Sequence, residues 1–115
     1  MTPDAFRRLA LSFPETFEGA HMGHPDFRVN GRIFATLHGA GTDRGMVKVP
    51  PEEQHNLVQA HPGAFEPVNG AWGRQGCTSV RLEPVDVDTL RHALEIAWRC
   101  ATAMPPPKTQ PRKRR

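Results

Sequence analysis

The chain of 115 residues lacks tyrosine, contains only two cysteines and has no long apolar run. A membrane-spanning helix needs about 20 consecutive apolar residues, so we expect no membrane partner. The first residues do not combine a basic segment with an apolar run, and a secretory signal is not expected either. Cys77 and Cys100 allow one disulfide at most, which is typical of a protein of the reducing cytoplasm.

The signatures of common enzyme classes are also missing. The chain contains no G-x-S-x-G nucleophile motif, no phosphate-binding loop with its Lys-Ser/Thr pair and no dinucleotide fingerprint. Cys77 can in principle act with a histidine as a nucleophilic pair. A cysteine that opens a strand is more often a small packing residue, however. We therefore predict no catalytic residue, no enzyme activity and no cofactor.

Two histidines are spaced as ligands of one metal ion would be. His21 and His24 are separated by two residues, but a zinc site needs three or four ligands and supporting hydrogen bonds. The other histidines and the cysteines contain no second pair at this spacing, so we predict no metal site. Surface or loop positions are the expected places for these side chains.

Positive charge is distributed unevenly along the chain. Lys and Arg number 15 against 12 Asp and Glu, yet residues 1–104 contain ten basic and twelve acidic side chains. The excess lies in residues 105–115, PPPKTQPRKRR, where prolines prevent a helix and no apolar group is available for burial. We expect one domain over 1–104 and a disordered tail that either solubilises the protein or adds phosphate contacts. The last four basic residues of the tail are Arg112, Lys113, Arg114 and Arg115.

Helices are predicted at both ends of the domain and near its middle. Thr2 can cap the first helix and Pro14 ends it. The second begins at residues 50–53, and Asp86 caps the third. The buried stripe of the third helix is expected to comprise Val87, Leu90, Leu94, Ala97, Trp98 and Ala101.

Short strands are predicted between these helices. Asn30-Gly31 tolerates positive φ at both central turn positions, so it is typical of a tight hairpin. A second turn at residues 39–43 extends this hairpin into a three-stranded antiparallel meander. The fold class is therefore α+β, a two-layer antiparallel sheet with helices packed on one face. The predicted strands cover residues 15–21, 27–29, 32–37, 45–49, 65–68 and 78–82.

Basic side chains gather on the predicted strands and turns. Hairpins with arginine near their tips can contact phosphates or enter a groove of DNA. The acids Asp26, Asp43 and Glu83 leave an alternative open, in which the arginines form ion pairs on a solvated sheet face. The candidates for nucleic-acid contacts in the domain are Arg28, Arg32, Arg44, Lys48, Arg74 and Arg81.

A tryptophan lies beside an arginine in the glycine-rich segment 69–76. An exposed Trp72 could stack on a base or on another planar ligand. The alternative is that Trp72 covers one edge of the small core, and we expect this second role.

An ordered set of short segments extends over residues 4–104. These segments are Arg8-Leu9-Ala10-Leu11, Pro14-Glu15, the run from Gly23 to Ala35, Val47-Lys48-Val49-Pro50, Trp72-Gly73, Gly76, Thr78-Ser79-Val80-Arg81-Leu82 and Trp98-Arg99. In this order they resemble the MmcQ/YjbR family of small bacterial proteins. One departure is Cys77, which stands where the family pattern often has an aromatic residue.

The resemblance implies a CyaY-like α/β fold and DNA binding through a double wing of β-hairpins. One wing would be the Asn30-Gly31 hairpin and the other would lie within residues 72–82. We predict a monomeric cytoplasmic protein that binds DNA weakly, in a salt-sensitive way, through its hairpins and basic tail. The alternative is a small-molecule or protein interaction module with a pocket near His21, His24 and Trp72.

Overall fold

The computed structural model describes residues 1–21, 23–38 and 43–103. Residues 39–42 of the second predicted turn and the predicted tail lie outside these ranges. The strands are β1 (Phe17–His21), β2 (His24–Val29), β3 (Arg32–Leu37), β4 (Arg44–Lys48), β5 (Phe65–Pro67) and β6 (Cys77–Arg81). The helices are α1 (Pro3–Leu11), α2 (Pro51–Ala60), α3 (Ala71–Arg74) and α4 (Val87–Ala103).

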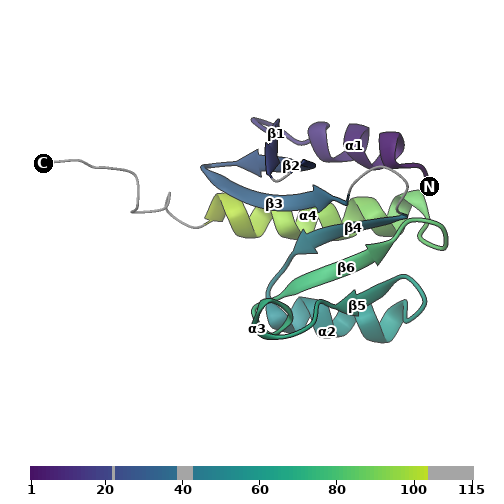
Figure 1. Cartoon of the computed structure of the whole chain (residues 1–115). Helices are drawn as coiled ribbons and strands as arrows, with labels where there is room; N and C mark the ends of the chain where they lie inside the picture. The colour runs from purple at the N-terminus through teal and green to yellow at the C-terminus, as the bar shows by residue number, and fades with distance from the viewer. Residues whose placement is uncertain (22, 39–42, 104–115) are drawn as a thin grey trace, which may run out of the picture.

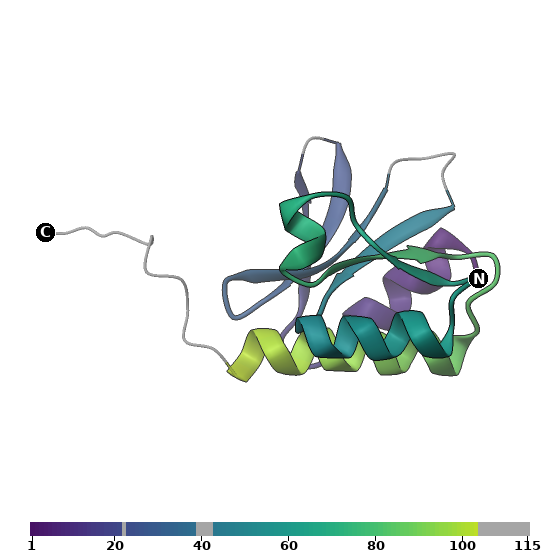
Figure 2. The same ribbon diagram turned by 90° about the horizontal axis from the view of Figure 1, so that it is seen from below.

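All six strands form one antiparallel sheet in the order β1-β2-β3-β4-β6-β5 (Figure 1). The helices α1, α2 and α4 lie on the same side of this sheet (Figure 2). The predicted α+β class, with a two-layer arrangement and helices on one face, is therefore confirmed. Within the described parts of the chain, no helix combines the length and the apolar character needed to cross a membrane.

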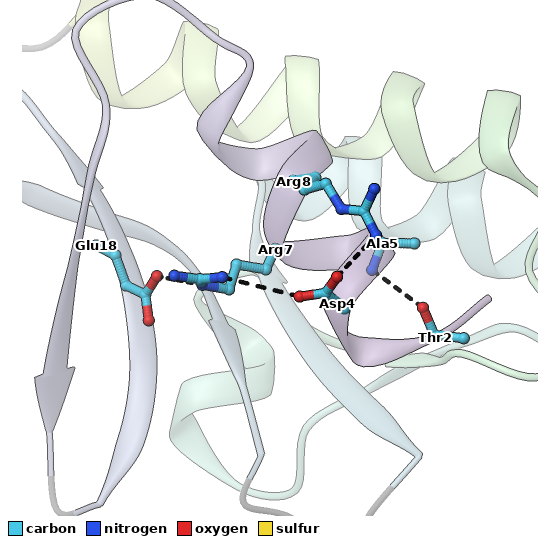
Figure 3. A network of polar contacts seen from close by, with 6 residues as sticks. All are labelled: Thr2, Asp4, Ala5, Arg7, Arg8 and Glu18. Atoms are coloured by element: carbon cyan, nitrogen blue, oxygen red, sulfur yellow. Dashed lines mark hydrogen bonds and ion pairs between the residues drawn. The ribbon is translucent and has the colours of Figure 1, made fainter.

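The first helix begins where the sequence predicts. The Thr2 hydroxyl accepts a hydrogen bond from the Ala5 amide at 3.1 Å and so caps α1. Asp4 forms ion pairs with Arg7 and Arg8 on the following turn, and Arg7 also donates to Glu18 of β1 (Figure 3). The capped helix is thus attached to the edge strand of the sheet.

The predicted Asn-Gly hairpin connects β2 and β3. Asn30 and Gly31 have φ values of 57° and 75°, as a primed two-residue turn requires. The Asn30 side-chain amide also donates to the carbonyl of Ala101 at 3.1 Å. This contact attaches the hairpin to the end of α4, so its position is set by the helix layer.

The core lies between the sheet and the helices. The stripe predicted for α4 is largely confirmed, and Ala93 joins it. Val87 was wrongly included, because it is 47% exposed in the first turn and the preceding Val85 occupies the buried position at this end. Trp98 is only partly buried and stacks on Phe13. The largest fully buried side chains are Phe6, Phe27, Phe34, Phe65, Leu82, Leu90 and Leu94.

The glycine-rich segment contains the short helix α3, which the sequence did not predict. After α3 the chain turns into β6 at Gly76, whose φ is +108°. The Val49 amide donates to the Gly76 carbonyl at 3.2 Å, and a Cβ on Gly76 would lie 1.7 Å from the Val49 carbonyl oxygen. Only glycine therefore fits at the junction of α3 and β6.

We expect Gly76→Ala to lower the free energy of unfolding by about 2–4 kcal/mol, through strain and the clash with Val49. Urea denaturation followed by circular dichroism measures this change. Gly63→Ala is the matched control, because a Cβ there meets no atom within 4 Å, and its effect should stay below about 0.5 kcal/mol. Equal losses in both variants would contradict this account of Gly76.

Candidate functional site

The strand register places a set of basic side chains on the sheet face opposite the helices. Residues alternate between the two faces along a strand, and directly opposed residues share a face. Gly45 and Val47 of β4 lie opposite core residues, so Arg44, Met46 and Lys48 point to the other face. We call this surface the open face, and its residues are Arg28, Thr36, His38, Arg44, Met46, Lys48, Ser79 and Arg81.

One of these cations is neutralised within the protein. The Arg28 guanidinium donates to both carboxylate oxygens of Asp26, at 2.7 and 3.0 Å, and the Asp26 side chain is buried. The hydrogen bond and the charge of Asp26 raise the pKa of Arg28 above its ordinary value. The alternative of internal ion pairs is thus correct for Arg28, which is held by the sheet rather than available to a phosphate.

Two other cations face each other without such a partner. Arg44 and Arg81 are directly opposed on β4 and β6, where like charges repel. Arg44 donates to the Ser79 hydroxyl at 3.2 Å. Among the described residues, neither Asp43 nor Glu83 forms an ion pair with them, although both acids line the same hollow of about 570 Å³. The side chains of Arg44 and Arg81 thus retain donors for an external anion.

A groove of about 870 Å³ adjoins the open face, on the side of α3. Its lining is mainly apolar, and Trp72 of α3 is 65% exposed beside it. The expectation that Trp72 covers the core is therefore wrong, because the buried positions at this end belong to β6 and α2. The polar and charged side chains of the lining are Arg28, Arg32, Thr36, His38, Lys48 and Gln75.

A buried glutamine holds α3 in place. The Gln54 side-chain amide on α2 lies 3.0 Å from the carbonyls of Gly73 and Cys77 and 3.1 Å from the Thr78 hydroxyl. Gly73 packs so closely that an added Cβ would lie 1.7 Å from the Val68 carbonyl oxygen. The backbone that carries Trp72 is therefore rigidly attached, and Gln54 was not predicted because its partners are distant in sequence.

Of the three predicted pocket residues, His24 and Trp72 do not line the same groove, and the side chain of His21 lies outside the described part of the structure. Trp72 lines the groove with His38, and His24 is not among the lining residues. The His24 ring lies 6.2 Å from the ring of His38. Among the described residues there is no group of three or more side chains suited to a metal ion.

The remaining predicted contacts are dispersed. Arg32 lines the groove, whereas Arg74 is exposed on α3 outside it. Arg112, Lys113, Arg114 and Arg115 lie outside the described residues. Three polar groove residues, Thr36, His38 and Gln75, were not predicted from the sequence. Strand alternation could have indicated His38, because it lies two residues after Thr36 and so on the same face.

Cys77 is buried and is not placed to act as a nucleophile. It is 6% exposed, and burial raises the pKa of its thiol, against a smaller lowering by Lys48. The thiol is therefore protonated at neutral pH, and a thiolate is what a nucleophilic cysteine needs. Both Cys77 and Cys100 are free thiols.

The fold and this surface define a small α+β protein with a basic sheet face beside an aromatic groove. The YjbR family model matches residues 11–100, and the chain belongs to the YjbR family, as the resemblance predicted. No curated protein matches the chain.

A solved structure supports the same fold. The crystal structure of the Deinococcus radiodurans protein DR2400, with the family-model domain DUF419, is similar with a TM-score of 0.73 and 24% sequence identity. The similarity covers 97% of this chain and 83% of that chain. At this identity the likeness concerns the fold alone.

We expect His38 to titrate below the ordinary histidine range. Partial burial lowers the pKa of His38, and the charges of His24 and Arg44 lower it further. On acidification, the His38 side chain of the unfolded chain binds a proton at a higher pH than that of the folded chain. The stability that neutral His38 contributes is therefore fully present above about pH 6.5, and it declines as the pH falls through the pKa of His38 in the folded protein.

An NMR titration of the His38 ring protons tests this expectation. Arg44→Gln should raise the pKa of His38, because it removes a nearby positive charge. Arg91→Gln, on α4, is the control and should leave that pKa unchanged. A wild-type His38 pKa above 6.5 would contradict the expected effect of partial burial and of the nearby positive charges.

We expect iodoacetamide to modify Cys100 before Cys77 in the folded protein at pH 8. The Cys77 thiol is buried and its pKa is raised, whereas Cys100 is only partly buried. Peptide mass spectrometry over a time course measures both rates, and denaturant should make them similar. Faster modification of Cys77 in the folded state is the outcome that would refute an inert role.

Proposed function

We propose that this protein binds nucleic acid through the open face of its sheet. The observation that carries the proposal is the juxtaposition of Arg44, Lys48 and Arg81 on one face, without acidic partners among the described residues. Phosphate oxygens bind well to such guanidinium and ammonium donors. The proposal concerns a binding protein rather than an enzyme.

Charge on this face favours a polyanion although the domain as a whole is slightly acidic. Asp26 is neutralised by Arg28, and the other acids near these cations are Glu66 at the edge of the sheet and Asp43 and Glu83 in the hollow beside Arg44 and Arg81. The acids of the helix layer include Glu52, Glu53 and Asp88, on the opposite side of the sheet. Among the described residues none of the three acids near the cations forms an ion pair with Arg44, Lys48 or Arg81, so a phosphate backbone that approaches β4 and β6 meets cations with donors still available.

This proposal differs from the double wing in its contact residues. Arg28 is engaged by Asp26, so the central strands β4 and β6 supply the phosphate contacts and the Asn30-Gly31 hairpin contributes Arg32 at the groove. The basic tail would add affinity that depends strongly on salt. We place the protein in the cytoplasm, where nucleic acid is available and where its two free thiols stay reduced.

A small-molecule binding module is the second candidate function. The mainly apolar groove of about 870 Å³ beside Trp72 favours it, since binding pockets for small ligands are concave and apolar with a few polar groups. The two candidates differ in their dependence on salt. Binding that is insensitive to salt and to the open-face cations would favour the small-molecule module.

The test compares two triple variants of equal charge change in the full chain. We expect the open-face variant Arg44→Gln, Lys48→Gln and Arg81→Gln to reduce the slope of log affinity against log salt by about 2, because three phosphate contacts are lost. Fluorescence anisotropy with labelled oligonucleotides between 50 and about 300 mM salt measures the slope.

The matched control is the variant Arg8→Gln, Arg91→Gln and Arg99→Gln, whose arginines form exposed ion pairs on α1 and α4. It should leave the slope nearly unchanged. Equal effects of both triple variants would mean that net charge alone governs binding. A third variant replaces the five basic residues of the tail by Gln, namely Lys108, Arg112, Lys113, Arg114 and Arg115. If this variant alone abolishes binding, the open face is not the nucleic-acid binding site.

A further inference from the structure

We infer that the nucleic acid bound by this protein is single-stranded and that one unpaired base stacks on Trp72. This inference rests on the proposed function and specifies its substrate class. Trp72 is the most exposed of the three large apolar side chains that the described residues leave in solvent, at 65%. A large aromatic side chain left in water beside a groove is typical of a binding site.

The two tryptophans of the chain have different environments. Trp98 stacks on Phe13, with ring centroids 6.0 Å apart, and its indole N–H donates to the Pro14 carbonyl at 3.1 Å. It therefore has a structural role in attaching α4 to the end of α1. Trp72 lines the groove and belongs to no ring pair among the described residues. Packing within the fold explains the position of the Trp98 side chain, but it does not explain the exposed position of Trp72.

The support beneath Trp72 fits a stacking platform. The hydrogen bonds from Gln54 and the close approach of Gly73 to Val68 hold α3 against the sheet. The indole is therefore attached to a rigid backbone, which reduces the entropy lost when a base stacks on it. An aromatic on a mobile loop would lose more of the stacking energy to ordering.

Charge beside the groove selects a nucleotide over a neutral planar molecule. Lys48 lies in the lining with Trp72, and Gln75 adds an amide that can hydrogen-bond to a base edge. Lys48 also belongs to the open face, so the groove and the basic surface of Arg44 and Arg81 are continuous through β4. A strand can place a base in the groove and its neighbouring phosphates along β4.

A duplex does not supply the stacking partner. Its bases are paired and stacked on each other, and exposing one requires flipping it out of the helix at a cost of a few kcal/mol in general. Single strands offer every base face, and each base stacked on an aromatic side chain contributes substantially to affinity. The combination of an exposed aromatic and a basic face thus favours a single strand of DNA or RNA.

The experiment measures binding of labelled dT12, rU12 and a 12-base-pair duplex to the full chain by anisotropy. We expect Trp72→Ala to weaken binding of the single strands by about 5- to 150-fold and duplex binding by less than about 2-fold. Trp72→Phe should retain most of the affinity, because the smaller ring still stacks. Phe17→Ala, an exposed aromatic on β1 outside the groove, is the control and should change neither affinity.

Intrinsic fluorescence gives an independent readout. Single strands should quench the tryptophan emission of the wild type, and the quenching should be lost in Trp72→Phe, where Trp98 alone remains. Whichever of dT12 and rU12 binds more tightly identifies the kind of strand. Competition by free thymidine monophosphate as effective as the strand would overturn the inference in favour of a mononucleotide pocket.

The failure of this inference can be distinguished from failure of the proposed function. If Trp72→Ala leaves single-strand binding unchanged, or weakens strand and duplex equally, stacking is refuted. The open-face triple variant then still reports on the proposed function. If the wild type binds neither strand nor duplex at low salt, the proposed function fails and the stacking inference fails with it.

Discussion

The register of β4 between β3 and β6 is the constraint on which both the core and the open face depend. Val47 lies opposite Ala35 on one side and Thr78 on the other, and all three are fully buried. A shift of one residue would exchange the two faces of β4 and move Arg44 and Lys48 into the core. Burying an unpaired charge costs more than a small domain can offset from its total stability. Packing of the apolar residues therefore places the cations in solvent.

The same packing sets the position of the aromatic groove. Gln54 is buried on α2, and its amide satisfies carbonyls of α3 and β6 that would otherwise be left without donors. Because an unsatisfied buried carbonyl is costly, this arrangement is maintained as part of the fold. Trp72 then projects from a helix whose other side is closed by Gly73. Its exposure is a consequence of how the core is completed.

Local patterns in the sequence predicted the elements that local chemistry controls. The Thr2 cap and the Asn30-Gly31 turn depend on a few neighbouring residues, and both occur as predicted. The helix α3 and the exposure of Trp72 depend on contacts with α2, about 20 residues away in sequence. Such contacts leave no periodic signal, so the segment was interpreted as a glycine-rich stretch and Trp72 as part of the core.

The sequence predicted which residues belong to the candidate site better than it predicted how they are arranged. Most of its cations were predicted because they lie on the predicted strands and turns, but the sequence does not say which face of the sheet the helices cover. The sequence left open whether Arg28 pairs with an acid such as Asp26 or contacts phosphate. In the structure Asp26 is buried and forms an ion pair with Arg28, so pairing is the observed alternative. The groove depends on the place of α3 beside the sheet, which is a property of the whole fold.

The distribution of charge resolves a conflict between the net charge of the domain and its proposed partner. Residues 1–104 are slightly acidic, which taken alone argues against a polyanion. Coulomb interactions at a surface are screened within about 10 Å at 0.1 M salt, so a bound strand responds mainly to the face it contacts. The sheet separates that face from the acids on α2 and α4. The local arrangement of Arg44, Lys48 and Arg81, which form no ion pairs among the described residues, therefore matters more for binding than the sum over the domain.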